Sequence, residues 1–185
     1  EQGGGDAAAA PQAVRLQIGR PGQLSTLKWH PLRSEEEGLR EGELLVDTSA
    51  VSMHFKDVML AMGMLDSFKP IIGMECSGLV RAIAPARPGE APSPFKVGDR
   101  VMCLAMSTSS GEDRTALFGT TCRVQARQTV AVPANVSMAD ASGFLGVMAT
   151  AWYALVTTAR LAKGETLLLH SALGTPYFAW AETHA

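Results

Sequence analysis

A candidate for chemistry lies at residues 170–174, which read HSALG and follow the apolar run LLL at 167–169. When a glycine-containing turn follows a buried strand, the backbone can approach a pyrophosphate, and the next helix points its positive end at that charge. Only one glycine is present here, and the residues TP follow it. By spacing alone, a strand that ends in an ordinary turn is therefore favoured over a dinucleotide site.

Thiols and imidazoles, which are common ligands of zinc, are the other reactive groups of the sequence. The three cysteines are Cys76, Cys103 and Cys122, and the four histidines are His30, His54, His170 and His184. No two of them have the spacing of a zinc finger, so a structural zinc site is not expected. An odd number of widely spaced cysteines does not indicate a disulfide framework, and a reducing, cytoplasmic location is the simpler interpretation.

The composition is that of a globular chain and indicates neither a nucleic acid nor a membrane as a partner. The sequence has 185 residues, of which 46% are hydrophobic and 18% are charged, and its formal net charge is -2. This length can bury a core and suggests one domain or one and a half. The nearly neutral charge gives no reason to expect a polyanion. The longest apolar run is about 13 residues long, whereas a membrane-spanning helix needs about 20.

The elements that must position these groups begin with short strands separated by turns. Alternating apolar and polar residues predict strands at 14–18, 26–29, 43–51, 78–84, 100–104, 118–126 and 129–132. One short helix is expected among them, because Phe55, Val58, Met59 and Met62 share a helical face and Gly63 suits its end. The pattern predicts a small barrel or sandwich at residues 14–132, after a flexible Gly/Ala-rich linker at residues 1–13.

The pattern changes at Pro133. Ser137 and Asp140 resemble a helix cap, and an alanine-rich helix is expected over residues 138–161. After a break at 163–165, residues 166–170 predict a buried apolar strand. A helix that leads into such a strand is how a layered α/β domain begins.

Seven segments in one order resemble the enoyl reductase domain of highly reducing, fungal-type type I polyketide synthases, a branch of the medium-chain dehydrogenase/reductase family. They read LQIGRPG at 16–22, LSTLKW at 24–29, FKDVM at 55–59, GMECSG at 73–78, VGDRV at 97–101, ATAW at 149–152 and GETLLLHSA at 164–172. The resemblance implies a mainly β, GroES-like substrate-side barrel at 14–132. The first helix and strand of an incomplete Rossmann-type α/β domain would follow at 133–174, and a divergent tail at 175–185.

The resemblance also implies a reaction. NADPH would deliver hydride to the β-carbon of an α,β-unsaturated acyl thioester held on an acyl carrier protein. Charge would develop on the thioester oxygen as an enolate, and the α-carbon would then take a proton. Such chemistry needs a nicotinamide held over the alkene and a donor near that oxygen.

Two adjacent residues are the catalytic candidates that the resemblance implies. Lys56 would donate to the enolate oxygen or protonate carbon, although a lysine off the apolar helix face could also be a surface residue. Asp57 is the second candidate, and a role in holding the loop or capping the short helix is the favoured interpretation for it.

The cofactor-binding candidates that the resemblance implies are His54, Thr150, His170, Ser171 and Gly174. His54 and Thr150 would line the nicotinamide cleft. An asparagine is common at the position of His54, and Thr150 could instead bond its own helix backbone. Zinc-dependent relatives carry a histidine ligand where this chain has methionine, so the resemblance implies a zinc-free member.

Three hypotheses follow for the function. The first is a fragment of an NADPH-dependent enoyl reductase. Because the family continues with Gly-Gly-Val-Gly after the Ser-Ala and this chain does not, we expect the chain alone neither to bind NADPH tightly nor to turn over substrate. The second is a non-enzymatic structural or interaction module with a GroES-like barrel, and the third is a truncated quinone-reductase-like oxidoreductase. The exposed edge of the strand at 166–170 would favour poor solubility or a homodimer.

Overall fold

The structure is a computed structural model that describes residues 13–32, 38–65, 72–86, 88–89, 91–105, 117–168 and 170. The expected linker, apart from its last residue, and the divergent tail lie outside the described residues. So do Ser171 and Gly174. Among the described residues, no helix is both long and apolar enough to cross a membrane.

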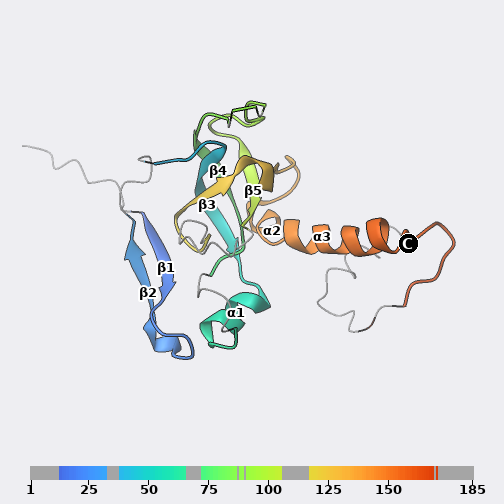
Figure 1. Cartoon of the computed structure of the whole chain (residues 1–185), viewed down its shortest axis with the longest axis horizontal. Coiled ribbons are helices and arrows are strands. Elements are labelled where there is room, and N and C mark those ends of the chain that lie inside the picture. Colours follow the sequence, from blue (N-terminus) through green and yellow to red (C-terminus); the bar gives the residue numbers. More distant parts are fainter. Residues whose placement is uncertain are drawn as a thin grey trace, which may run out of the picture.

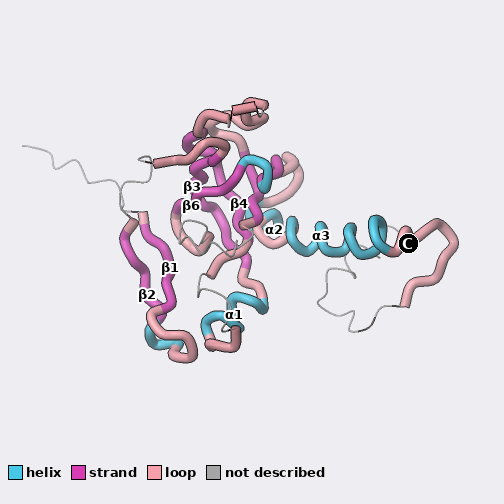
Figure 2. Tube along the Cα trace, viewed as in Figure 1, coloured by secondary structure: helices cyan, strands magenta, loops and turns pink. Residues whose placement is uncertain are grey.

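A five-stranded antiparallel sheet forms the centre of the fold (Figure 1). Its strands lie in the order β6-β3-β4-β5-β7. Their bounds are Glu43–Ser52 for β3, Glu75–Ile83 for β4, Arg100–Leu104 for β5, Thr121–Gln125 for β6 and Thr129–Ala131 for β7. A separate hairpin of β1, Val14–Ile18, and β2, Leu27–Pro31, lies beside this sheet (Figure 2). The hairpin is joined to the sheet region by backbone hydrogen bonds from β1 to the segment before β6.

The long strand β3 organises the barrel because it pairs with β4 on one side and β6 on the other. Its pairing with β4 shifts register between Leu45 and Val46 and again between Thr48 and Ala50. Such irregularities bend and twist a strand, which helps a sheet to curl around one core. That core contains fully buried residues of β3, β4 and β5 and of the segment before β6, namely Leu44, Val46, Cys76, Val101, Cys103 and Leu117.

The predicted strands are found close to their expected bounds. The strands at 14–18 and 100–104 agree with β1 and β5, and those at 43–51 and 129–132 differ by one residue. The strand expected at 78–84 begins at Glu75 instead, and the one at 118–126 is shortened to β6. The mainly β character of the predicted fold is thus confirmed, and its strands lead to the helices that carry the remaining candidates.

The short helix α1, Phe55–Ala61, forms where the sequence predicts it, but its predicted apolar face is wrong. Phe55 is 73% exposed and Val58 is 42% exposed, whereas Asp57, Leu60 and Ala61 are buried. The reason is that the Asp57 carboxylate is held by backbone N–H groups inside the fold, which turns the opposite face outward.

The helical region after the barrel consists of α2, Met138–Ala141, α3, Leu145–Trp152, and a π-helical segment, Tyr153–Thr158. Ser137 caps α2 as expected, because its hydroxyl accepts from the Asp140 N–H at 3.1 Å. Two side chains of the sheet bind backbone carbonyls just before and within α2. Ser77 donates to Met138 at 2.5 Å, and Arg100 donates to Val136 at 2.6 Å.

The strand expected over residues 166–170 is not formed where the structure describes that segment, so this prediction is wrong. Residues 165–168 have no regular secondary structure, and Leu168 is 77% exposed. A parallel strand is stable only beside neighbours that accept its hydrogen bonds and cover both of its faces. No such neighbour pairs with it among the described residues.

Candidate functional site

The amino-terminal end of α1 is fixed by one buried carboxylate. The Asp57 side chain accepts from the backbone N–H of His54 at 2.8 Å and from that of Gly73 at 2.9 Å. Asp57 is 4% exposed, so these bonds are shielded from water. The first holds the helix start, and the second ties α1 to the chain that enters β4. Asp57 therefore holds the loop and caps the helix, which is the role that the sequence analysis favours for it.

Gly73 is needed for this arrangement because of its backbone. Its φ is 91°, in the left-handed region that favours glycine. A Cβ at this position would lie 2.2 Å from the backbone nitrogen of Phe118. The glycine therefore allows the chain entering β4 to approach the segment before β6, while its N–H reaches Asp57.

The His54 side chain lies against a second buried carboxylate, that of Glu75 at the start of β4. The distance from His54 Nε2 to Glu75 Oε1 is 3.3 Å. The His54 side chain is 23% exposed, whereas that of Glu75 is 1% exposed. The imidazole is thus partly open to solvent, and the carboxylate behind it is not.

The same carboxylate oxygen also binds helix α3. The Gly146 N–H donates to Glu75 Oε1 at 2.8 Å. The Gly146 carbonyl in turn accepts from the Thr150 hydroxyl at 2.7 Å. Thr150 is exposed, and its hydroxyl bonds its own helix, which is one of the two alternatives that the sequence left open.

Burial raises the pKa of the Glu75 carboxyl above its usual value of 4.5. The nearby His54 imidazole and the backbone N–H groups of Gly146 and Leu145 oppose this shift without cancelling it. The second carboxylate oxygen, Oε2, is buried and has no hydrogen-bond partner. Burial therefore favours the protonated form of Glu75 relative to a carboxyl group in water.

The structure brings together some of the predicted site residues and not others. His54, Lys56 and Asp57 lie at the start of α1, and Thr150 joins His54 through Glu75 and Gly146. Lys56 is half-buried. His170 is exposed, beyond the segment without regular structure. Ser171 and Gly174 lie outside the described residues.

Two residues of this cluster, Glu75 and Gly146, were not site candidates in the sequence analysis. A charged residue between Met74 and Cys76 at the edge of an apolar strand is one signal that could have found the first. The signal for Gly146 is a glycine in the first turn of a helix, where alanine is the better helix former. Both signals indicate a contact that the sequence alone does not identify.

The three cysteines are free thiols packed in the barrel core. The Sγ atoms of Cys76 and Cys122 lie 3.3 Å apart. Contacts with the Cys103 and Cys122 thiols, together with burial, hold the pKa of the Cys76 thiol well above its usual range. A thiol that resists ionisation is a poor nucleophile, so Cys76 acts as a small core residue. Within the described ranges, no three histidine, cysteine or acidic side chains are placed to hold a metal ion.

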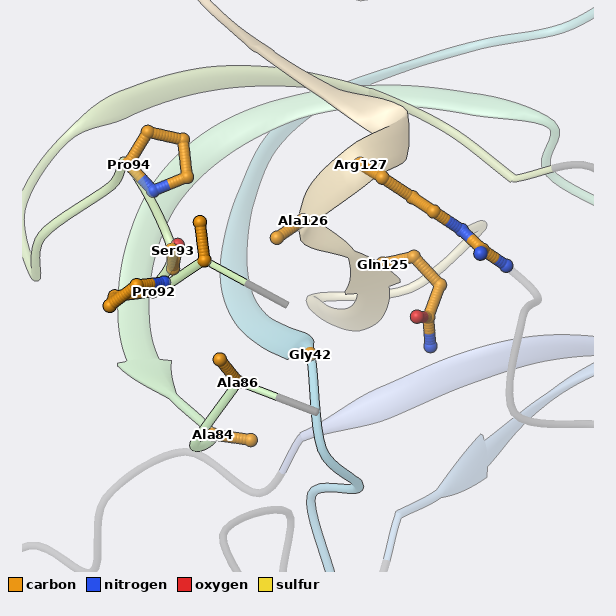
Figure 3. Close-up of a pocket in the computed structure, with 10 residues that line it drawn as sticks. Gly42, Ala84, Ala86, Pro92, Ser93, Pro94, Gln125, Ala126 and Arg127 are labelled. Atoms are coloured by element: carbon orange, nitrogen blue, oxygen red, sulfur yellow. The ribbon is translucent and has the colours of Figure 1, made fainter. Parts of the chain in front are cut away.

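The described residues also form two hollows whose linings do not include His54, Lys56, Asp57 or Glu75. A cavity of about 230 Å³ lies where β3 begins and β6 ends, and it is lined mainly by small residues and prolines (Figure 3). His54 follows the other end of β3, so this cavity does not belong to the site. A more open groove of about 520 Å³ lies along residues 48–51, in the second half of β3, beside Trp29 and Phe118. The rings of these two residues are 6.5 Å apart.

The sequence of this chain is similar to parts of polyketide synthases. The chain is 36% identical over 161 residues to a highly reducing polyketide synthase of Cladosporium cladosporioides. The match covers 87% of this chain and 6% of the synthase, so the chain corresponds to a small part of that protein.

Solved structures give the same result. The CurK enoyl reductase matches with 25% identity and a TM-score of 0.77, over 94% of this chain and 51% of that one. A quinone oxidoreductase from Coxiella burnetii, at 18% identity and a TM-score of 0.70 over 88% of this chain and 50% of that one, shares the fold alone. The predicted resemblance to polyketide synthase enoyl reductases of the medium-chain dehydrogenase/reductase family is confirmed. The alcohol dehydrogenase GroES-like domain matches residues 40–164, and the chain belongs to this family.

Proposed function

We propose that the chain is the substrate-side part of an NADPH-dependent enoyl reductase that acts on α,β-unsaturated acyl thioesters during polyketide synthesis. The observation that carries the proposal is the 36% identity to a highly reducing polyketide synthase across 87% of this chain. The acyl carrier protein that holds such thioesters is the partner that this function requires. The quinone-reductase alternative has weaker support, because likeness at 18% identity concerns the fold alone.

The exposed surface around α1 suits an acyl substrate. Met53 is 66% exposed, Phe55 73%, Val58 42% and Met62 44%, and all four lie within ten residues of His54. Apolar side chains grouped on a surface favour an apolar ligand or partner. In the proposed complex, the acyl chain lies against these side chains, with its thioester towards Lys56.

The polar groups nearby fit a nicotinamide. The Thr150 hydroxyl gives its proton to the Gly146 carbonyl, so its oxygen can accept from the carboxamide NH₂. The partly exposed His54 imidazole offers a second polar contact on the barrel side. Bound NADPH would supply the hydride for the β-carbon. Lys56 would place its ammonium group near the thioester oxygen and stabilise the negative charge that develops there.

The test uses the whole chain and a small thioester. Crotonyl-N-acetylcysteamine is added to ¹⁵N-labelled protein, and amide shifts are followed with and without NADPH. We expect the largest changes at His54, Lys56 and Thr150, because these residues surround the proposed site. Saturating changes that are confined to other regions, or none at millimolar thioester, would contradict the proposal.

A matched pair of variants separates the proposed role of Lys56 from surface charge in general. Lys56→Met should weaken thioester binding, because the ammonium near the thioester oxygen is removed. Lys96→Met, at a turn before β5, removes the same charge away from α1 and should leave binding unchanged. Equal effects of both variants would mean that Lys56 acts only through net charge.

Two further expectations belong to this proposal. We infer that the chain by itself binds NADPH weakly, because the turn expected to approach the pyrophosphate has one glycine. A fluorescence titration that gives tight binding would contradict this. We also infer a cytoplasmic location, which the three free thiols support. Cell fractionation, with alkylation of the protein to show that its three thiols stay reduced, is the measurement that tests this location.

A further inference from the structure

We propose that Glu75 is a positioning residue that sets His54 and helix α3 in one fixed relation. His54 and Thr150 are the two proposed nicotinamide contacts, and they come from opposite sides of the site. The inference rests on the proposed function only in taking those two residues as cofactor contacts. The structural part of the inference is that the Glu75 carboxylate holds both His54 and α3, and this part can be tested without any cofactor.

The first argument is the continuous set of polar contacts. His54 Nε2 lies 3.3 Å from Glu75 Oε1, and the Gly146 N–H donates to that same oxygen at 2.8 Å. The Gly146 carbonyl accepts from the Thr150 hydroxyl at 2.7 Å. One oxygen on β4 therefore connects the residue before α1 with the first turns of α3. A shift of Glu75 would move both proposed cofactor contacts relative to each other.

The second argument is the glycine that makes the contact possible. A Cβ on residue 146 would lie 2.0 Å from Glu75 Oε1 and 3.1 Å from its Cδ. Any side chain at this position would thus displace the carboxylate or the helix. Glycine is a poor helix former, so its presence in the first turn of α3 is compensated by the close approach of Glu75.

The third argument is the charge environment. Lys56 and Asp57 are the ionisable groups of α1, and the Asp57 carboxylate is already bound by two backbone N–H groups. Helix α3 reads LGVMATAW and carries no charged residue. The carboxylate of Glu75 is nearly inaccessible, and its Oε2 has no hydrogen-bond partner. The positioning contacts of Glu75 are therefore those of Oε1, with the imidazole and with α3.

This arrangement explains why an acid, and not an amide, suits the position. A glutamine could accept from Gly146, but only a carboxylate adds charge to the contact with the imidazole. His54 Nε2 is buried and lies 3.3 Å from Glu75 Oε1, which is ion-pair distance without hydrogen-bond geometry. A negative charge at that distance favours a proton, rather than a lone pair, on Nε2. Glu75 thus acts on the His54 ring through its charge and favours Nε2 as the nitrogen that carries the proton.

The test is NMR spectroscopy of the full chain without cofactor. Long-range ¹H–¹⁵N spectra report the protonated nitrogen of His54, and the Gly146 amide proton reports the carboxylate. In the unmodified chain we expect a His54 ring protonated at Nε2 and a Gly146 amide shift that changes with pH as Glu75 titrates. In Glu75→Gln, the pH dependence at Gly146 should be lost and the His54 ring signals should change.

Two more variants make the outcome decisive. Gly146→Ala keeps the carboxylate but displaces it, so the His54 ring signals should change as they do in Glu75→Gln. Glu41→Gln removes an exposed carboxylate before β3 and should change neither signal. If Glu75 only held α3, Glu75→Gln would alter Gly146 and leave the His54 ring unchanged, which would overturn the proposal. A ring protonated only at Nδ1 in the unmodified chain would also overturn it, even if both variants failed to fold. Because neither NADPH nor thioester is present, failure of the proposed function would leave these results standing.

Discussion

Substitution of Gly146 by alanine sets two physical effects of opposite sign against each other. Alanine is the better helix former, so replacing an exposed glycine in a helix by alanine usually raises the free energy of unfolding by up to about 1 kcal/mol. At this position, however, the new Cβ would lie 2.0 Å from Glu75 Oε1. The carboxylate would have to move, and the hydrogen bond from the residue 146 N–H would break.

The lost contact outweighs the gain in helix propensity. A hydrogen bond to a charged group contributes about 1.5 to 3 kcal/mol to stability, and leaving a buried partner unsatisfied costs a similar amount. Glu75 is almost fully buried, so water cannot readily replace the lost donor. After the gain in propensity is subtracted, Gly146→Ala should lower the free energy of unfolding by about 0.5 to 2 kcal/mol.

Urea unfolding followed by circular dichroism measures this change. A second background tests its cause, because in Glu75→Ala the carboxylate is absent and the remaining neighbour of the alanine Cβ at 146 is Leu104 Cδ1, at the ordinary van der Waals distance of 3.5 Å. There Gly146→Ala should stabilise the chain by about 1 kcal/mol, as helix propensity alone predicts. The sign of the effect is therefore expected to reverse between the two backgrounds, with a coupling of about 1.5 to 3 kcal/mol.

Two results would refute this reasoning. If Gly146→Ala stabilised the otherwise unmodified chain, the carboxylate would not be held by α3 as the structure shows. If the variant destabilised both backgrounds equally, the cost would come from some other neighbour of residue 146. Gly143→Ala provides a matched control, because its new Cβ would meet mainly the Ser52 side chain at 2.8 Å, which can rotate away.

The remaining predictions concern pH, backbone geometry and the core. Because burial raises the pKa of Glu75 above 4.5, the folded chain keeps a proton that the unfolded chain releases. The free energy of unfolding should therefore fall as pH rises from 4.5 towards that raised pKa, and urea titrations of Glu75→Gln should lack this step. Gly73→Ala should destabilise by about 2 to 4 kcal/mol. Gly89→Ala, with a φ of 85° and no atom within 4 Å of its Cβ, should cost only the backbone strain of about 1 to 2 kcal/mol. Leu44→Ala, in the core, should cost about 2 to 5 kcal/mol in thermal or urea unfolding, and Leu79→Ala, on the exposed face of β4, much less.

The positions of the strands along the chain could be predicted from the sequence because alternation and turns are local signals. The face of α1 could not, since helical periodicity identifies a face without saying what covers it. Phe55 and Val58 have the spacing of a core face, yet the buried Asp57 faces the fold. The carboxylate is turned inward by N–H groups of His54 and of Gly73, sixteen residues further along the chain. Such a long-range contact overrides a short periodic pattern.

The candidate site could be assembled from the sequence only in part. Resemblance supplied His54, Lys56, Asp57 and Thr150, because a motif carries its residues with it. It did not supply the contact between Glu75 and α3, since the two partners lie 71 residues apart and one contributes only a backbone N–H. A backbone N–H donor cannot be recognised from the sequence, apart from the small residue that lets the acceptor approach it.

The contacts between the sheet and the helical region share this property. Ser77 binds the carbonyl of Met138, Arg100 binds that of Val136, and Glu75 binds the N–H of Gly146. In each case a side chain of β4 or β5 recognises backbone, so most side chains of the helical region are not fixed by these bonds. Position 146 is the exception, because the carboxylate occupies the space that a Cβ would need. The sheet and the helical region are also joined by apolar packing, in which Ala141, Met138 and Leu145 lie against Met102. Changes in α3 should therefore affect the relation between barrel and helix through Gly146 and through Leu145.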